Sequence, residues 1–337
     1  MEKPHLESDS RAFAPLEMAE ASVPKATAVA ACTAMAVFYV AILYSPTLIL
    51  RLPHPTSVKS FMIRRFVCAA ISSIVSAFAS ALLLPIGSFQ AASSIFGVYG
   101  IRVDHLWQAV VFPLSLTSLL YTGSLVSKCT FLASAWNENK FHAEGCSVEC
   151  IKRAPQRLLD QIQSIASNVL AWRVYVVAPF TEEVVFRACM IPLLLCGGFK
   201  TSTIVFLSPI FFSLAHLNHF LELYCLQNYS FCRAALIVGP QLGYTVIFGS
   251  YASFLFIRTG HLLSPTVAHI FCNVMGLPVL LPPRRKGVTI LAFLAGMVGF
   301  FWLLFPATST DLYNDRTDNC RCWHGYCSWT SKNPRVT

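Results

Sequence analysis

Apolar residues gather into long runs along this chain instead of alternating with polar residues. A helix needs roughly 20 such residues to cross the hydrocarbon core of a bilayer. Runs of about that length occupy residues 27–50, 66–88, 108–127, 168–196, 201–217, 234–257, 261–279 and 288–306. The pattern predicts an all-α, polytopic membrane helix bundle with about eight transmembrane helices.

The predicted spans differ in quality. Pro46 interrupts the first run, and the runs at 201–217 and 261–279 are short. Residues 90–107 are only half apolar, which predicts an interfacial or re-entrant connection. Residues 128–167 form the one long hydrophilic loop. These features affect the number of spans and leave the predicted fold class unchanged.

The apolar runs divide the chain into a polar N-terminal tail at 1–25, a transmembrane domain at 26–306 and a C-terminal tail at 307–337. The mixed charge of the first tail is unlike a cleavable signal peptide, so we expect the first span to stay in the membrane. The C-terminal tail holds a close group of thiols and one imidazole, namely Cys320, Cys322, His324 and Cys327. This spacing allows a metal site or a disulfide, although reactive thiols in an exposed tail are the simpler interpretation.

The composition agrees with a membrane protein. Of the 337 residues, 55% are hydrophobic and only 12% are charged, whereas about 25% of a typical soluble domain is charged. The net charge of +9 does not indicate nucleic-acid binding, because Lys and Arg stand mainly in short clusters between the apolar runs. Such clusters act as topology signals and contact anionic membrane lipid.

Basic residues are distributed unevenly between alternate loops. The loops after predicted helices two, four and six hold only Arg102, Lys200 and Arg258. The loops after helices one, three, five and seven hold Arg51, Lys59, Arg64, Arg65, Lys128, Lys140, Lys152, Arg153, Arg157, Arg233, Arg284, Arg285 and Lys286. The positive-inside rule places this second set in the cytosol and both tails on the far side. An oxidising compartment there would favour a disulfide over zinc in the C-terminal tail.

The fourth predicted helix carries charged residues at Glu182, Glu183 and Arg187. Ionisable groups inside an apolar helix are costly, so they should face the protein interior or a water-filled cavity. Glu183 and Arg187 are four residues apart and can pair on one helix face. That pairing leaves Glu182 as a candidate general base, although a purely structural charge pair between helices is the simpler alternative. Pro179 should kink the same helix and free a carbonyl group.

Two other helices carry further polar side chains. Phe212 precedes His216 by four residues, and His269 precedes Asn273 by four, so each pair shares one helix face. With the predicted topology, His216, His269 and Asn273 can share one half of the membrane with Glu182. His219 either lines the same cavity or lies at the membrane interface.

These groups suit peptide hydrolysis. Glu182 and His216 would activate a water molecule, while His269 and Asn273 would donate hydrogen bonds to the tetrahedral oxyanion. The chain has no HExxH motif, but a glutamate with two histidines could also bind zinc. We therefore predict no required cofactor, with a zinc-dependent protease as the mechanistic alternative.

Three motifs in the sequence carry a resemblance to a known family. Glu182, Glu183 and Arg187 match EExxxR, Phe212 and His216 match FxxxH, and His269 and Asn273 match HxxxN. In this order on separate membrane helices, they resemble the type II CAAX prenyl endoproteases, the Ras-converting enzymes of the CPBP superfamily. Residues 244–278 resemble the eukaryotic members in particular.

The resemblance implies an endoplasmic reticulum membrane enzyme whose active site faces the cytosol. It would remove the C-terminal tripeptide of prenylated CAAX proteins such as small GTPases. In the family, the first glutamate and the FxxxH histidine activate water and the HxxxN pair forms the oxyanion hole. These roles fall on Glu182, His216, His269 and Asn273. Glu183, Arg187 and Phe212 become supporting residues, with Arg187 as an alternative ligand for the substrate carboxylate.

Two alternatives from other classes remain at this point. Some members of the superfamily have uncertain activity, so a non-catalytic membrane scaffold is one alternative. A transporter with the glutamates as a proton relay is the other, and two recognisable halves would favour it. The sequence contains no internal repeat of that kind.

Overall fold

Helices form every regular element in the part of the chain that the computed structural model describes, which is residues 23–53, 55–84, 92–141, 156, 159–160, 163–276 and 286–314. Four helices there are long and apolar enough to cross a membrane, or five if one bent pair counts as a single span, and shorter apolar helices accompany them. The all-α polytopic membrane bundle is therefore confirmed. The tail cysteines lie outside the described residues, as do the N-terminal 22 positions.

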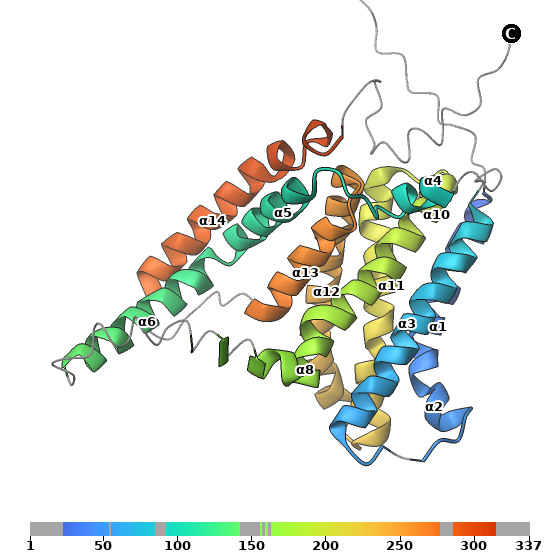
Figure 1. The fold of residues 1–337 in the computed structure, drawn as a ribbon, viewed down its shortest axis with the longest axis horizontal. Coiled ribbons are helices and arrows are strands. Elements are labelled where there is room, and N and C mark those ends of the chain that lie inside the picture. Colours follow the sequence, from blue (N-terminus) through green and yellow to red (C-terminus); the bar gives the residue numbers. More distant parts are fainter. Residues whose placement is uncertain are drawn as a thin grey trace, which may run out of the picture.

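The first two long helices, α1 (Lys25–Ala41) and α3 (Val58–Leu83), run in opposite directions along one side of the bundle (Figure 1). α1 (Lys25–Ala41) continues through a 3-10 turn, Ile42–Tyr44, into the short α2 (Ser45–Leu48). Pro46 stands in the first turn of α2, where the missing N–H costs nothing. α3 (Val58–Leu83) begins eight residues before the predicted apolar run, because the Ser57 side chain caps the backbone N–H of Ser60 at 3.1 Å.

The third predicted span is bent. α5 (Leu106–Leu120) and α6 (Thr122–Phe141) meet at Tyr121 with an angle of 78° between them. The Tyr121 hydroxyl bonds to the Tyr244 hydroxyl at 2.9 Å and donates to the Gly276 carbonyl at 2.8 Å, which ties the bend to the main bundle. The first 14 positions of the predicted hydrophilic loop are helical, because α6 continues through them.

The half-apolar segment at 90–107 contains the short helix α4 (Ala92–Val98), which lies at one end of the bundle (Figure 1). Beyond it, the carbonyl of Gly100 accepts a hydrogen bond from the Leu262 amide at 2.9 Å. Gly100 has a φ of +69°, and an added Cβ would stand 2.8 Å from that same amide nitrogen. The segment is therefore packed against the turn between α12 (Phe231–Thr259) and α13 (Leu263–Met275). Its predicted position at a membrane interface stays a prediction.

The fourth predicted span is a continuous helical segment in which two π-helical turns interrupt the α-helix. Its parts are α8 (Val169–Trp172), the π-helical η3 (Arg173–Val177), α9 (Ala178–Glu183), the π-helical η4 (Val184–Cys189) and α10 (Met190–Cys196). π-helical turns are rare and are frequent at functional sites. In this chain they flank the Glu182–Glu183 pair on both sides.

The remaining helices surround this segment. α11 (Thr201–Leu221) leads into a π-helical turn, Glu222–Leu226, and packs along α12 (Phe231–Thr259). α13 (Leu263–Met275) follows the turn at Gly260, and α14 (Lys286–Ala307) packs against α5 and α6 before the 3-10 turn at Thr310–Leu312. Helices therefore occupy all eight apolar runs. The number that cross the membrane stays a prediction, because α13 has only 13 residues.

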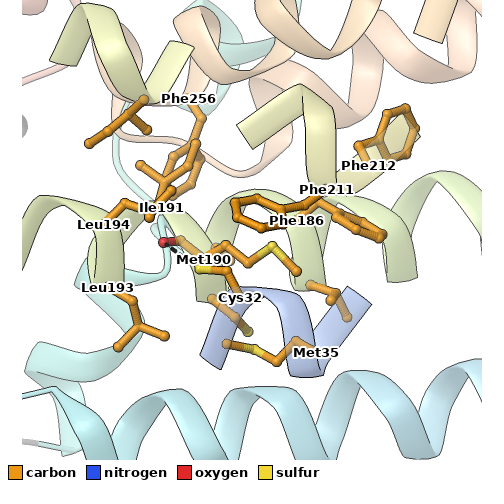
Figure 2. Close-up of a cluster of buried hydrophobic side chains, with 14 of the residues drawn as sticks. Cys32, Met35, Phe186, Met190, Ile191, Leu193, Leu194, Phe211, Phe212 and Phe256 are labelled. Carbon is orange, nitrogen blue, oxygen red and sulfur yellow. Dashed lines mark hydrogen bonds between the residues drawn. The ribbon is translucent and has the colours of Figure 1, made fainter. Parts of the chain in front are cut away.

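The core centres on the segment Val169–Cys196. Residues of η4 and α10, among them Phe186 and Met190, are fully buried against α1 and α11 (Figure 2). The Cys32 thiol donates weakly to the Met190 carbonyl at 3.9 Å and is completely buried. Lipid tails are as apolar as these side chains, so close van der Waals packing between the helices fixes the helix that carries the two glutamates.

Serines of α3 hold the carbonyls at the boundaries of η4. The Ser73 hydroxyl lies 3.0 Å from the Ala69 carbonyl of its own helix and 3.4 Å from the Thr181 carbonyl, and Ser80 donates to the Cys189 carbonyl at 3.0 Å. In an apolar surrounding, such side chains can satisfy backbone groups that a π-helical turn leaves without an α-helical partner. α3 thus supports the irregular helix on both sides of the glutamates.

A polar cluster closes the end of the bundle near α4. Arg102 pairs with Asp104 and donates to Asn314 and to the Tyr313 carbonyl, both at 2.8 Å. Burial alone would raise the pKa of Asp104, but the hydrogen bond and charge of Arg102 outweigh burial and lower this pKa. This cluster joins the segment after α14 to the loop before α5.

Gly296 allows the close approach of α14 to the bend between α5 and α6. A Cβ at this position would overlap the Leu119 carbonyl oxygen and the Thr122 side chain. We expect Gly296→Ala to destabilise the protein by about 1–3 kcal/mol, measured as a lower Tm in detergent. Gly299→Ala is the matched control, because its Cβ would meet only Leu119 methyl groups at 3.7 Å. Equal Tm values for the two variants would contradict this packing.

Candidate active site

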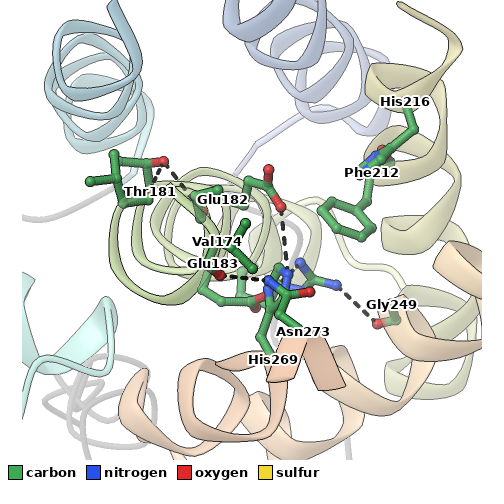
Figure 3. Close-up of polar contacts among 12 residues, drawn as sticks. Val174, Thr181, Glu182, Glu183, Phe212, His216, Gly249, His269 and Asn273 are labelled. Atoms are coloured by element: carbon green, nitrogen blue, oxygen red, sulfur yellow. Dashed lines mark hydrogen bonds and ion pairs between the residues drawn. The ribbon is translucent and has the colours of Figure 1, made fainter. Parts of the chain in front are cut away.

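Side chains from α9 and α13 meet near the middle of the bundle (Figure 3). The Nδ1 atom of His269 lies 2.8 Å from Glu183 Oε1, and its Nε2 atom lies 3.8 Å from Glu182 Oε2. The imidazole therefore stands between two carboxylates. An ionised carboxylate can only accept hydrogen bonds. Nδ1 of His269 therefore carries a hydrogen and donates a hydrogen bond to Glu183.

Glu183 and Arg187 form the ion pair that their spacing predicts. Arg187 Nη1 lies 3.1 Å from Glu183 Oε1, and both side chains have 0% exposure. The guanidinium also donates to the Gly249 carbonyl at 3.4 Å and lies over the Phe212 ring at 4.5 Å. Oε1 of Glu183 therefore accepts from both Arg187 and His269.

Glu182 differs from its neighbour because 16% of its side chain is exposed. It lines a cavity of about 110 Å³ together with His216, Thr181, Arg65 and other residues, namely Tyr39, Val40, Leu43, Phe66, Ala69, Arg173, Val177, Ala178, Phe186 and Ala215. A cavity needs only about 10–15 Å³ of such volume to hold one water molecule, so this cavity can contain water. Glu182 is thus the carboxylate of the pair that can reach solvent or substrate.

The cavity lies toward one end of the bundle. Leu43 stands just after α1 ends, and Arg65 and Arg173 stand near the start of α3 and of the segment Val169–Cys196. This end carries most of the basic residues of the described chain, and α4 and the end of α10 lie at the other (Figure 1). The positive-inside rule predicts that it faces the cytosol.

His216 lies on α11 and shares the cavity with Glu182. Its Nδ1 is 2.9 Å from the Phe212 carbonyl, which can only accept, so Nδ1 is the protonated nitrogen and Nε2 can serve as a base. The Phe212 ring contacts His216 at 4.7 Å and His269 at 6.2 Å between ring centres. The predicted span at 201–217 placed His216 near the end of its helix. In the structure, α11 and the π-helical turn after it continue for ten more residues, so His216 lies farther from the helix end than predicted.

Asn273 donates from Nδ2 to the Val174 carbonyl at 2.9 Å. In the π-helical η3 the N–H of Ala178 bonds to Arg173, five residues earlier. The same pattern would pair Val174 with Pro179, which has no N–H. Pro179 therefore leaves the Val174 carbonyl without a π-helical donor, and this carbonyl accepts from the Asn273 side chain, while the predicted kink stays a prediction.

The structure brings His269 into direct contact with the two glutamates and joins His216 to them through the shared cavity and the Phe212 ring. The side chain of His219 lies outside the described residues, although its backbone belongs to α11. The sequence did not reveal Arg65 and Arg173 as cavity residues, because basic residues at helix ends are ordinary topology signals. It also missed the hydrogen bond of 2.9 Å between the Tyr39 and Thr181 hydroxyls below Glu182.

The zinc alternative needs three protein ligands around one point. Among the residues with described positions, no group of three or more His, Cys, Asp or Glu side chains is arranged to hold a metal ion. His269 also directs its Nδ1 atom to Glu183 and its Nε2 atom toward Glu182. These side chains therefore do not fit a zinc ion in this arrangement.

Comparison with known proteins agrees with the motifs. The family model "Type II CAAX prenyl endopeptidase Rce1-like" matches residues 164–275, which contain all three motifs. The chain is 59% identical to CAAX prenyl protease 2 of Arabidopsis thaliana over 91% of its length and 98% of that protein. It is 34% identical to CAAX prenyl protease 2 of Homo sapiens, with 84% and 81% covered. No solved structure matches the chain significantly.

The helices and the buried acid–base residues define a polytopic membrane protein with a site inside its helix bundle. More specifically, the chain belongs to the type II CAAX prenyl endopeptidase family.

Proposed function

We propose that this protein is an intramembrane endopeptidase that removes the C-terminal tripeptide from prenylated CAAX proteins. The observation that carries the proposal is the cavity that the partly exposed Glu182 and His216 both line, beside the pair His269 and Asn273. The names of the relatives in Arabidopsis thaliana and Homo sapiens support the substrate class.

In the proposed reaction, Glu182 and Nε2 of His216 position a water molecule in the cavity and accept its proton. The hydroxide attacks the carbonyl carbon of the prenylated cysteine, and the peptide C–N bond breaks when the tetrahedral intermediate collapses. The proton passes to the leaving amine of the tripeptide. Hydrolysis changes no oxidation state, so water is the only co-reactant.

The oxyanion of the intermediate would be stabilised by His269 and Asn273. One N–H of the Asn273 amide is used by Val174, and the second can donate to the oxyanion. For His269, Nε2 can donate only when the ring holds both protons, and the carboxylates at 2.8 Å and 3.8 Å would balance that charge. Preorganised donors of this kind typically contribute about 10²–10³ in kcat.

The membrane surroundings suit a lipid-modified substrate. The prenyl chain would stay in the bilayer while the peptide enters the cavity from the end that is predicted to face the cytosol. We place the protein in the endoplasmic reticulum membrane and propose small GTPases among its substrates, as the family resemblance implies.

A farnesylated CAAX peptide and its unprenylated twin test this function with purified protein. We expect release of the tripeptide from the farnesylated peptide, detected by mass spectrometry. The kcat/KM of the twin should be at least about 100-fold lower, which corresponds to burial of only three or four methylene groups at about 0.8 kcal/mol each. Absence of cleavage of either peptide would point to a non-catalytic scaffold.

A further inference from the structure

Two arginines line the same cavity as Glu182 and His216. Arg65 comes from the second turn of α3, and Arg173 is the first residue of η3. Both side chains are half-buried between helices. Basic residues near helix ends usually face the membrane surface, whereas these two line the cavity of Glu182. The planar guanidinium also matches a carboxylate with two parallel hydrogen bonds.

We propose that Arg173, assisted by Arg65, binds the C-terminal carboxylate of the substrate and so fixes the distance between the chain end and the cleaved bond. This assignment rests on the proposed function and adds a specificity-determining role to it. A protease that removes three residues from a chain end must recognise that end, and its only obligatory charge is the terminal carboxylate.

The separation of Arg173 and Glu182 fits a tripeptide. They are nine residues apart on one helical segment, which is about 13 Å along an α-helical axis. Three extended residues span at most about 10–11 Å. The flexible arginine side chain can cover the remaining few ångströms. A carboxylate held at Arg173 would therefore place the third peptide bond from the chain end close to Glu182.

The π-helical turn makes this arrangement possible. In an uninterrupted α-helix, residues nine apart are separated by 2.5 turns and point to opposite sides. The turn η3 (Arg173–Val177) lies between the two residues and changes the phase of the helix. Arg173 and Glu182 both line the cavity.

Other basic residues nearby do not have this position. Arg187, the alternative ligand for the substrate carboxylate, has 0% exposure and pairs with Glu183. On α3, Arg64 donates to the Pro53 carbonyl at 2.7 Å, and Lys59 is exposed. A topology signal or a contact with lipid head groups would not require Arg65 and Arg173 to face the cavity of Glu182.

A farnesylated CAAX peptide with a free C-terminal carboxylate, compared with the same peptide as its C-terminal amide, tests the inference. Wild type should prefer the acid by about 10–100-fold in kcat/KM, the range for a charge-assisted hydrogen bond. Arg173→Gln should remove most of this preference by raising KM for the acid, while cleavage of the amide is unchanged. Arg173→Lys should restore part of it, and Arg65→Gln should act in the same direction more weakly.

Lys59→Gln is the matched control, since it removes a positive charge from the same end of α3 and should leave the preference intact. Cleavage of the amide reports folded enzyme in each preparation. Equal cleavage of acid and amide by wild type, or an equal loss of both in Arg173→Gln, overturns the role of the arginines and leaves the protease function standing. Failure of wild type to cleave either peptide overturns both proposals.

Discussion

Glu182→Gln is expected to lower kcat for the farnesylated peptide by about 10³-fold, within the range that a general base contributes. The amide keeps the size of the side chain and cannot accept a proton from water. Because Glu182 is partly exposed in the cavity and Glu183 pairs with Arg187, this change leaves the buried ion pair intact. The Tm of the variant should therefore stay close to that of wild type.

Activity is measured as initial release of the tripeptide, normalised to protein that elutes as a monodisperse peak in detergent. Asp160→Asn is the control, because Asp160 is an exposed carboxylate that accepts a hydrogen bond from Gln156 at 3.2 Å and does not line the cavity. It should behave as wild type. If Glu182→Gln keeps more than about a tenth of wild-type kcat, Glu182 is not the base.

Glu183→Ala should instead destabilise the protein strongly. It leaves Arg187 charged and buried at 0% exposure with the Gly249 carbonyl as its remaining acceptor among the described residues. Removing one partner of a buried pair costs about 3–5 kcal/mol. The same change also removes the acceptor that fixes the His269 ring, so activity should fall together with stability.

The double variant Glu183→Leu, Arg187→Met separates these two effects. Apolar side chains of similar size often replace a buried ion pair without loss of stability, so the Tm should recover while peptide cleavage stays low. Thermal unfolding in detergent and cleavage of the farnesylated peptide measure the two quantities. A Tm for Glu183→Ala that equals the wild-type value would show that the pair is not buried in the membrane.

The sequence predicted the regular helices well and the irregular ones poorly. The apolar run at 234–257 became α12 with only two or three more residues at each end, because Ser230 and Gly260 cap it. The bend at Tyr121 was missed, since apolar residues continue on both sides of it. Run length alone cannot distinguish a straight span from a bent one. The π-helical turns η3 and η4 were also missed, because hydropathy does not depend on how tightly a helix is wound.

For the candidate site, local spacing predicted more than long-range contact. The pairing of Glu183 with Arg187 is confirmed, because four residues fix two side chains on one helix face. The contact between His269 and Glu183 joins residues 86 positions apart. No periodicity encodes such a contact, and packing of α13 against the segment Val169–Cys196 creates it. The catalytic roles of these residues stay predictions.

Pro179 contributes to this site because it has no backbone N–H. The motifs are defined by side chains that accept or donate protons, and a search for such groups passes over a proline. Yet the Val174 carbonyl, which Pro179 leaves without a backbone donor, accepts a hydrogen bond from Asn273, 99 positions away in the chain. A transplant of the motif residues into another helix bundle would therefore copy the visible chemistry and lose its alignment, unless the defect in the helix backbone were transplanted with them.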